Sequence, residues 1–440
     1  MISSVGRNRK RAKFCELEIS GLSHEGRGIS ERNGKTIFVD GALPGEKVIA
    51  RIIKKRSRFD EAQVAEILIS NENRIDPRCR HFGVCGGCSL QHMNEGDQIN
   101  HKQSVLLELL KHQSAVVPEK LLPPISSNQW GYRQKARLGV KWVKGKNGVV
   151  VGFREKFKGF VTDSTECEVL DPRVGKKIIQ LRMLLQSLSI SDRIPQLEIA
   201  TTKDTVSIVI RHLSPFSAED LDVLKCFGRK HEFDFYLQSE GVDSIFALEN
   251  TFTELSYELD GIEIGFKPTD FTQINSGVNY AMVKKVIELL DPKEGDEVLD
   301  LFCGIGNFSL AVAARGAKVT GLEIDVEMVE QAKMNAYRNK ITNCSFLAID
   351  LQDVYKLQSV DACKINKVLL DPPRSGAKET LAELKLPATE KVLYVSCNPM
   401  TFSRDAGILK EMYGFGLSQL GILDMFPHTS HFECIGLFER

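Results

Sequence analysis

Cys397 stands in the sequence where a thiol could take part in chemistry. It follows the short apolar run of residues 391–395, which is typical of a buried parallel strand, and Ser396-Cys-Asn-Pro is typical of the turn that leaves such a strand. In open α/β sheets, ligands bind at the carboxyl ends of the strands. Because Pro399 lacks an N–H and Asn398 tolerates turn geometry, Cys397 would be held on a rigid corner and could act as a nucleophile. For Cys397 taken alone, a buried structural cysteine is an equally good interpretation.

Three further cysteines, Cys79, Cys85 and Cys88, fall within ten residues of a glycine-rich stretch. This clustering favours metal ligation over three separate core positions. A tetrahedral thiolate site needs a fourth ligand, and Cys167 is the best candidate for it. Only one C-x2-C pair is present, so we expect a [4Fe–4S] cluster held by four thiolates, although the spacing alone leaves zinc open.

The residues that follow three other predicted strands indicate a nucleoside site. Gly304 and Gly306 lie where a predicted strand turns into a helix, so the backbone there can approach a ligand closely. Glu323 ends the next strand, about 20 residues on, where an acidic residue commonly binds ribose hydroxyls. Ser309 replaces the third glycine of the dinucleotide fingerprint, which disfavours a nicotinamide cofactor. Adenosine without pyrophosphate indicates S-adenosylmethionine, with Asp350 near the adenine.

The motif Asp371-Pro-Pro-Arg follows the fourth predicted strand. Its two prolines restrict the backbone and would hold Asp371 rigidly at the same edge of the sheet. An ordinary turn is the alternative interpretation. Polar residues nevertheless follow all four predicted strands, and the packing of a core does not by itself require a polar residue at every strand end.

The predicted secondary structure that must position these residues differs between three parts of the chain. Residues 14–68 show short alternating strands, which predict an oligonucleotide-binding (OB-like) β-barrel in a first domain, 1–70. A second, β-rich domain, 71–265, would carry the cysteine cluster, one amphipathic helix near 173–188, and a helix at 95–113 that packs on the catalytic domain. Alternating strands and helices in 266–440 predict a parallel, doubly wound, Rossmann-like sheet. The expected fold class is therefore multidomain α/β.

Composition and charge limit the function classes. A hydrophobic content of 42% and a charged content of 26% are typical of a globular protein with a substantial core. No apolar run is long enough to span a membrane, and no apolar segment follows the basic N-terminus, so we expect a protein of the reducing cytoplasm without disulfides. The formal net charge is zero, but residues 1–60 carry an excess of seven basic residues and residues 131–160 an excess of eight. Two basic stretches indicate contact with nucleic acid, with solvated β-domain faces as the alternative.

Four motifs in this order resemble the RNA uracil-C5 methyltransferases. They are Phe271-Thr-Gln-Ile-Asn, Asp371-Pro-Pro-Arg, Ser396-Cys-Asn-Pro and Phe426-Pro-His-Thr-Ser-His-Phe-Glu. The N-terminal stretch, with His24-Glu-Gly-Arg-Gly, resembles the TRAM domain found at the front of several RNA-modifying enzymes. The resemblance covers essentially the whole chain and is strongest to members that methylate a uridine of 23S rRNA.

The resemblance implies a catalytic domain of the class I methyltransferase fold and a role for each matching residue. Cys397 would be the nucleophile and Glu433 the proton acceptor, and Cys79, Cys85, Cys88 and Cys167 would bind a [4Fe–4S] cluster. The residues around the methyl donor and the target base would be Gln273, Phe302, Asn307, Glu323, Asp350 and Asp371. The implied partner is 23S rRNA, presented as a single strand or a flipped uridine, and the protein is expected to act as a monomer.

The chemistry accounts for these residue types independently. Uracil C5 is a poor nucleophile until a thiolate adds to C6, and a base must then remove the C5 proton so that the sulfur can leave. Glu433 is favoured as that base, with His431 as the alternative. The cluster is expected to order a loop for RNA contact, since methyl transfer from a sulfonium needs no electrons. Competing hypotheses are methylation of tRNA or of another rRNA uridine, a non-catalytic RNA-binding protein, and an iron–sulfur redox protein.

Overall fold

The computed structural model describes residues 13–249, 254–351 and 364–440. The chain forms two compact units, one of residues 1–101 with 428–430 and one of residues 102–427 with 431–440, and each is described by itself. This division does not test the predicted bounds 1–70, 71–265 and 266–440, which stay a prediction. Residues 1–12, part of the predicted basic N-terminal stretch, lie outside the described residues. Within the described ranges, no helix is long and apolar enough to cross a membrane.

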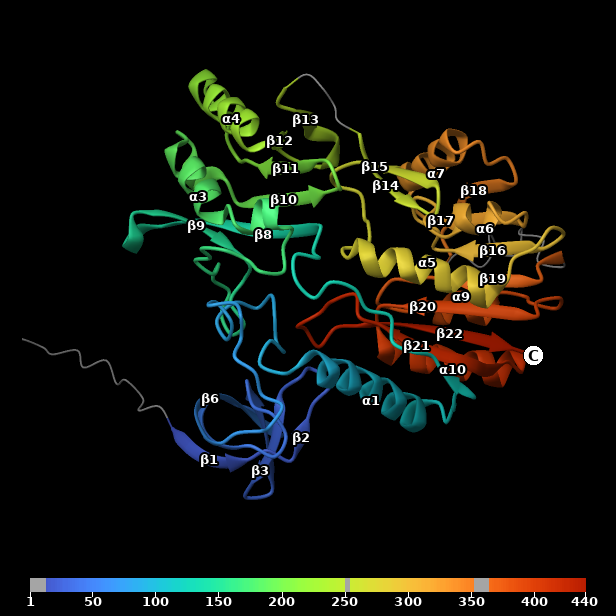
Figure 1. The fold of residues 1–440 in the computed structure, drawn as a ribbon, viewed down its shortest axis with the longest axis horizontal. Coiled ribbons are helices and arrows are strands. Elements are labelled where there is room, and N and C mark those ends of the chain that lie inside the picture. Colours follow the sequence, from blue (N-terminus) through green and yellow to red (C-terminus); the bar gives the residue numbers. More distant parts are fainter. Residues whose placement is uncertain (1–12, 250–253, 352–363) are drawn as a thin grey trace, which may run out of the picture. The chain divides into compact units, whose positions relative to one another are not determined.

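The first unit contains one six-stranded sheet, drawn in blue in Figure 1. Its strand order is β1-β5-β6-β4-β3-β2, and β4 runs parallel to β6 while the other neighbours are antiparallel. Alternate residues are buried, as in β1, so one face of the curved sheet forms a small apolar core. The alternation of apolar and polar residues in the sequence predicted such half-buried strands. The strands are β1 (Phe14–Glu18), β2 (Gly21–Leu22), β3 (Gly28–Arg32), β4 (Lys35–Asp40), β5 (Lys47–Lys55) and β6 (Phe59–Ile69).

The central part of the second unit is a six-stranded sheet of order β13-β12-β11-β10-β8-β9, packed against helices α3 and α4. The helix predicted near 173–188 is confirmed in part, since α3 lies within that span but does not fill it. Two short helices occupy that stretch, and α4 follows later, started by a capping box between Ser217 and Asp220. The elements are β8 (Lys135–Val143), β9 (Gly148–Gly152), α2 (Pro172–Gly175), α3 (Ile178–Ser187), β10 (Gln196–Thr201), β11 (Val206–Arg211), α4 (Ala218–His231), β12 (Asp234–Gln238) and β13 (Ile245–Ala247), with 3-10 turns at Lys144–Lys146, Ser191–Arg193 and Val242–Ser244.

The larger sheet of the second unit has eight strands in the order β18-β17-β16-β19-β20-β22-β21-β7. The first five are mutually parallel, and β22 lies antiparallel between β20 and β21. The five parallel strands are the doubly wound sheet that the sequence predicted, whereas the antiparallel β22 departs from the predicted parallel sheet. Its elements are β7 (Lys120–Leu121), β16 (Glu297–Leu301), α6 (Ser309–Ala313), β17 (Lys318–Glu323), α7 (Val326–Arg338), β18 (Cys344–Ala348), β19 (Lys367–Leu370), α9 (Lys378–Glu383), β20 (Lys391–Ser396), α10 (Pro399–Tyr413), β21 (Gly416–Leu423) and β22 (Glu433–Glu439).

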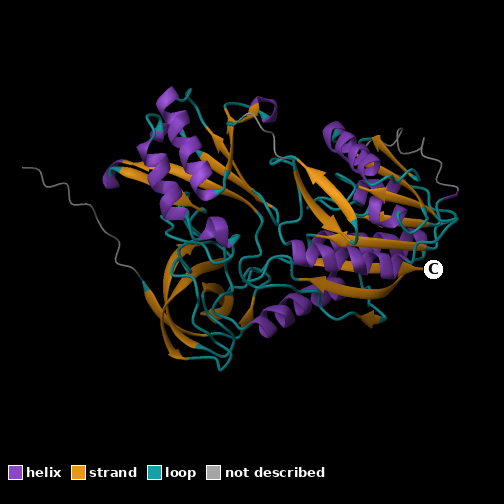
Figure 2. Cartoon of the chain, turned by 45° about the horizontal axis from the view of Figure 1, so that its top comes forward, coloured by secondary structure: helices purple, strands orange, loops and turns teal. Residues whose placement is uncertain are grey.

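Helices cover both faces of this sheet. Helix α5 (Ser276–Leu290) packs with Leu393 and Val395 of β20 in the main core, whereas Tyr394, between them, packs on Phe402 of α10. Because neighbouring side chains of a strand point to opposite faces, α5 and α10 lie on opposite sides of the sheet, as Figures 1 and 2 show. A hairpin of β14 (Leu255–Leu259) and β15 (Ile262–Phe266) precedes α5.

Helix α1 (Glu95–Gln113) fills the span predicted for a helix at 95–113. From Lys102 onward it belongs to the second unit. There it contacts α10, where the hydroxyl of Ser403 donates to the carbonyl of Leu109 at 2.9 Å. The ammonium group of Lys102 binds a carboxylate oxygen of Asp424 at 2.6 Å, and both side chains are buried. Helix α1 is far in sequence from the strands of the catalytic part, and these two contacts hold it against that part.

Candidate active site

Cys397 follows β20 directly and lies between that strand and α10. Asn398 caps the helix, since its side-chain oxygen accepts the N–H of Met400 at 3.1 Å, and Pro399 fits the first helical turn. The amide of Asn398 also donates to the carbonyl of Arg374 at 2.8 Å. The half-buried thiol is thus held on a corner at the carboxyl end of a parallel strand, as the sequence predicted.

Glu433 lies beside Cys397 because of strand register. Strand β22 runs antiparallel to β20 and their ladder ends with Cys434 paired to Ser396, so Cys397 and Glu433 are the next residues of the two segments, and the charge of Glu433 acts on the thiol of Cys397. Glu433 is 4% exposed, and its Oε2 atom accepts no hydrogen bond from the residues that the structure describes. Burial raises the pKa of Glu433 to about 7. His431, the alternative base, is exposed.

A second carboxyl group, Asp371, completes the surroundings of the thiol. It follows β19 directly, and its pKa is well above the usual range because it is buried, with the charges of Glu433 and Asp300 adding to the effect. The pKa of Cys397 is raised to about 11, first by burial and then by the charges of Glu433 and Asp371, while Arg374 acts in the opposite direction. The thiol and both carboxyl groups therefore influence one another's protonation.

The ends of β16 and β17 form the predicted nucleoside rim. Phe302 follows β16 with a φ of 67°, which turns the chain sharply into the glycine-containing loop. The N–H of Gly304 donates to one oxygen of Glu323 at 3.2 Å, and the N–H of Ile324 donates to the other at 2.8 Å. Asp350 comes two residues after β18, and the intervening Ile349 N–H donates to the Glu323 carbonyl at 2.8 Å. The structure thus brings Glu323 and Asp350 to neighbouring strand ends.

Asn307 and Gln273 occupy two different loops. The side chain of Asn307 exchanges hydrogen bonds with Asn279 of α5 at 3.1 Å and accepts the hydroxyl of Tyr257 at 2.9 Å. Gln273 lies in the loop between β15 and α5, two residues before Asn275, which caps α5. The sequence resemblance had indicated Asn307 but not the two side chains that hold it.

Asp300 is a buried group of the rim that the sequence analysis missed. It is the fourth residue of β16, and the hydroxyl of Ser309 donates to its Oδ2 atom, while Oδ1 accepts no bond from the described part of the chain. Burial raises the pKa of Asp300 to about 7. A carboxylate inside an otherwise apolar strand is the sequence signal that could have revealed it.

The donor set of the rim fits a methyl donor built on adenosine. Glu323 offers carboxylate oxygens to ribose hydroxyls, and the positive φ values of Gly304 and Gly306, 55° and 91°, let the backbone pass close to a ligand. A side chain at Gly306 would meet Leu310 and Phe346. Beside the rim, a thiol and a carboxyl group of near-neutral pKa are suited to nucleophilic addition and proton removal.

The four predicted cluster ligands are divided between the units. Cys79, Cys85 and Cys88 belong to the first unit and Cys167 to the second, and all four are partly exposed. The N–H of Gly87 donates to the sulfur of Cys85 at 3.4 Å, and hydrogen bonds to sulfur are common around iron–sulfur clusters. Across the described ranges, no three His, Cys, Asp or Glu side chains are arranged to hold a metal ion.

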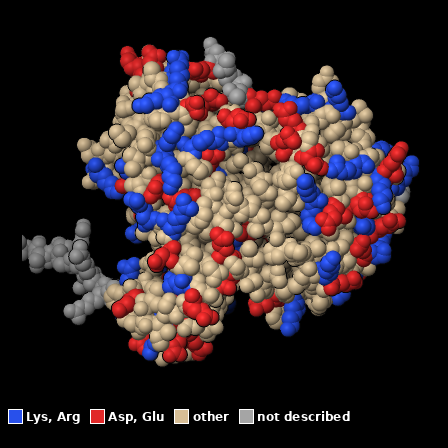
Figure 3. Space-filling view, in the orientation of Figure 1, with Lys and Arg blue, Asp and Glu red and all other residues tan. Residues whose placement is uncertain are grey.

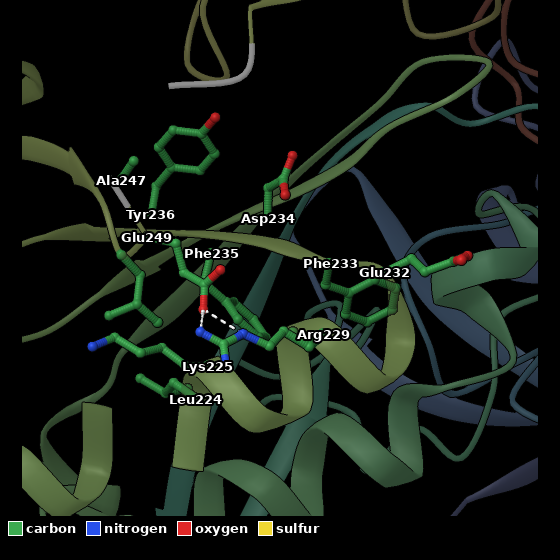
Figure 4. Close-up of a pocket in the computed structure, with 12 residues that line it drawn as sticks. Leu224, Lys225, Arg229, Glu232, Phe233, Asp234, Phe235, Tyr236, Ala247 and Glu249 are labelled. Carbon is green, nitrogen blue, oxygen red and sulfur yellow. Dashed lines mark hydrogen bonds and ion pairs between the residues drawn. The ribbon is translucent and has the colours of Figure 1, made fainter. Parts of the chain in front are cut away.

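A cavity of about 150 Å³ lies elsewhere in the second unit, beside α4, β12 and β13. Figure 4 shows the guanidinium of Arg229 turned toward Glu249, and the two side chains form an ion pair at 2.7 Å. No predicted site residue lines this cavity, so it is not part of the candidate active site.

Comparison with known proteins agrees with this geometry. Residues 94–440 match the family model tRNA (Uracil-5-)-methyltransferase, and residues 9–65 match the TRAM domain. The 23S rRNA (uracil(1939)-C(5))-methyltransferases RlmD of Nitrosococcus oceani and Alkalilimnicola ehrlichii are 47% and 45% identical to this chain. The first match covers 97% of this chain and 96% of its relative, and the second covers 99% of each.

A solved structure supports the fold over nearly the whole length. The tRNA (uracil-54, C5)-methyltransferase of Pyrococcus abyssi, in complex with S-adenosyl-L-homocysteine, superimposes with a TM-score of 0.74 at 24% identity and covers 96% of this chain and 99% of its own. By the family model and these relatives, the chain belongs to the RNA uracil-C5 methyltransferase family and is an S-adenosylmethionine-dependent enzyme with an N-terminal TRAM domain.

Proposed function

We propose that the protein methylates C5 of one uridine of 23S rRNA, of the uracil-1939 type, with S-adenosylmethionine as methyl donor. The single observation that supports the mechanism is the β20–β22 register, which ends one residue before Cys397 and Glu433, together with the effect of the Glu433 charge on the thiol. Relatives at 44–47% identity over nearly the full chain bear the name of this rRNA activity, which supports the choice of substrate.

Each residue then has a defined task. Cys397 loses its thiol proton to solvent, and the thiolate adds to C6 of the flipped uracil, so that the electron pair of the C5–C6 double bond makes C5 an enolate carbon. S-adenosylmethionine supplies an electrophilic methyl group to that carbon and leaves as S-adenosylhomocysteine. Glu433 removes the C5 proton, and the electron pair of the C–H bond re-forms the C5–C6 double bond as Cys397 leaves. Because the pKa of Glu433 is about 7, it can accept this proton at neutral pH and release it afterwards.

We assign the remaining predicted residues to binding. Glu323 and Asp350 would bind the nucleoside part of the donor, and Phe302 and Asn307 would shape its pocket. Gln273 and Asp371 would contact the target base, and the raised pKa of Asp371 lets a protonated carboxyl donate to a uracil oxygen. His431, being exposed, is not assigned the base function.

The decisive test uses rRNA fragments that contain 5-fluorouridine. With fluorine at C5 no proton can be removed, so wild-type protein and methyl donor should give a stable covalent complex with Cys397. The complex should be absent for Cys397→Ala. Glu433→Gln should instead trap natural uridine RNA as the methylated adduct. Turnover of natural RNA by Cys397→Ala at the wild-type rate would overturn the mechanism.

Methylation of tRNA is the second candidate function, because the matching family model is named for tRNA. Incubating 23S rRNA fragments and tRNA transcripts side by side with labelled methyl donor separates the two. We expect label in the rRNA fragment only, and label confined to tRNA would replace the rRNA assignment.

We further propose that Cys79, Cys85, Cys88 and Cys167 hold a [4Fe–4S] cluster with a structural role. The support is the spacing of the thiols and the N–H···S contact at Cys85. Iron and sulfide analysis of anaerobically purified protein should give four of each per chain. Any Cys→Ser change at these positions should lower both contents, and a preparation that is fully methylating without iron would refute the assignment.

We propose that the TRAM domain and the basic residues of 131–160 hold the RNA, and that the protein acts in the cytoplasm as a monomer. Lys141, Lys144 and Arg154 of the basic stretch are exposed. In Figure 3, blue Lys and Arg side chains lie on the face that carries the central sheet of the second unit, together with red Asp and Glu side chains. Binding of an rRNA fragment should therefore weaken steeply as salt rises.

A further inference from the structure

The turn that follows Asp371 is bound to helix α10 through its own backbone. The carbonyl of Arg374 accepts the amide of Asn398 at 2.8 Å and the hydroxyl of Thr401 at 3.4 Å. The guanidinium of Arg404 donates to the carbonyl of Ser375 at 2.9 Å. Two consecutive carbonyls of the turn are thus held by three side chains from the first two turns of one helix.

Asp405 is the buried centre of this arrangement. It is fully shielded from solvent, and its Oδ2 atom accepts both the N–H of Ala377 and the hydroxyl of Tyr394, each at 2.7 Å. Its Oδ1 atom accepts the Nε–H of Arg404 at 2.8 Å. The pKa of Tyr394 is well above its ordinary value because of burial and then the Asp405 charge, so the hydroxyl stays protonated and keeps donating.

Gly376 leaves room for this contact. Its φ of 77° suits glycine, and a Cβ atom there would lie 2.5 Å from Arg404 and 2.6 Å from the carboxylate of Asp405. The N–H of Gly376 also closes the turn onto the carbonyl of Pro373 at 2.8 Å. The turn and the carboxylate therefore fit together only with glycine at this position.

The carboxylate of Asp405 therefore binds two segments, the strand that leads to Cys397 and the turn that begins at Asp371. Tyr394 lies three residues before Cys397 on β20, and Ala377 ends the turn that begins at Asp371. We infer that Asp405 is a positioning residue, which fixes Asp371 and Arg374 at their places beside the thiol of Cys397. This inference rests on the proposed function of Cys397. Loss of the carboxylate contacts should loosen the site without removing any group that touches the substrate.

The most selective test is Tyr394→Phe, which removes one hydrogen bond to Asp405 and little volume. Tyr413→Phe is the matched control, because Tyr413 stands at the far end of α10 and donates to the carbonyls of Leu381 and Leu384. We expect Tyr394→Phe to lower kcat and the rate of 5-fluorouridine adduct formation about tenfold, with an unchanged KM for the methyl donor. It should also move the pH profile of Cys397 alkylation. Tyr413→Phe should change only the Tm.

Gly376→Ala and Asp405→Asn test the same contact from the turn and from the helix. Both should reproduce the loss in kcat, and Asp405→Asn should lose less than Asp405→Ala because an amide oxygen can still accept the Ala377 N–H. If Tyr394→Phe and Gly376→Ala match Tyr413→Phe in kcat, adduct rate and alkylation profile, Asp405 is only structural and the inference is wrong. If wild-type protein forms no adduct at Cys397, the proposed function itself fails instead.

Discussion

Cys397 and Glu433 lie side by side because β22 runs antiparallel to β20 with Cys434 paired to Ser396. The two residues are 36 positions apart in the chain, and α10 and β21 fold between them. A one-residue slip of this register would turn Glu433 to the other face of the sheet, because side chains alternate along a strand. The proposed nucleophile and the proposed base each stand next to the last pair of one strand ladder, so the pairing of β20 with β22 decides whether they meet.

The thiol of Cys397 should titrate far above neutrality in the free protein. Its pKa is about 11, with the charges of Glu433 and Asp371 contributing to the rise and Arg374 opposing it. Glu433→Gln removes one negative charge and should lower the pKa of the thiol, whereas Arg374→Met should raise it. Alkylation by iodoacetamide across a pH series, followed by mass spectrometry of the Cys397 peptide, measures both. The exposed Cys226 gives an internal reference in each sample. Equal profiles for the wild type and both variants would contradict the charge coupling.

Glu433 should make stability depend on pH. Its pKa rises from 4.5 in the unfolded chain to about 7 in the folded protein, so the folded state binds the proton more tightly. The stability that this proton confers is fully present below pH 4.5 and is lost as the pH rises through about 7. The introduced glutamine cannot titrate, so the free energy of unfolding of Glu433→Gln, relative to that of the wild type, should increase by on the order of 3 kcal/mol between pH 4.5 and pH 8. Tm measurements of both proteins at the two pH values give the difference. If the difference in Tm between the two proteins does not change with pH, the pKa of Glu433 is not raised in the folded protein.

Glu323 should contribute to binding of the methyl donor. Its carboxylate already accepts the N–H groups of Gly304 and Ile324, which leaves it oriented toward the rim. Glu323→Gln should weaken binding of S-adenosylmethionine about tenfold, since hydrogen bonds to a charged acceptor are stronger than those to an amide. Calorimetric titration measures this. Glu327→Gln makes the same change on exposed α7 and should leave the affinity unaltered. Equal affinities for both variants would remove Glu323 from the donor site.

The buried ion pair of Lys102 and Asp424 should be costly to break. Both side chains are shielded from solvent, and burial lowers the pKa of Lys102. Lys102→Met leaves the carboxylate of Asp424 uncompensated and should destabilise the catalytic sheet by about 3–5 kcal/mol. The double variant Lys102→Met with Asp424→Leu should recover most of that loss. Chemical unfolding of the three proteins tests the pair, and a double variant no more stable than Lys102→Met would argue against it.

The sequence by itself determined the local features of the catalytic part. Strand β17 ends at Glu323 as expected, and Asp371 directly follows β19, as expected for the residue after the fourth predicted strand. The corner at Cys397 was predictable because Asn398 and Pro399 restrict their own backbone. The family resemblance, and with it the chemistry, followed from motifs that are contiguous in the chain. Helix α4 was missed because it is polar on average and only three of its residues, Asp220, Leu224 and Gly228, are buried.

Only the tertiary structure decided which of these residues meet. The insertion of β22 between β20 and β21 depends on pairing between distant segments, which no local pattern encodes. The burial of Asp300 and Asp405 likewise could not be read from the sequence, nor could their donors from other elements, Ser309 for the first and Ala377 with Tyr394 for the second. The physical reason is that a side chain's chemistry depends on its solvation and on its neighbours, and both are set when the strands and helices pack.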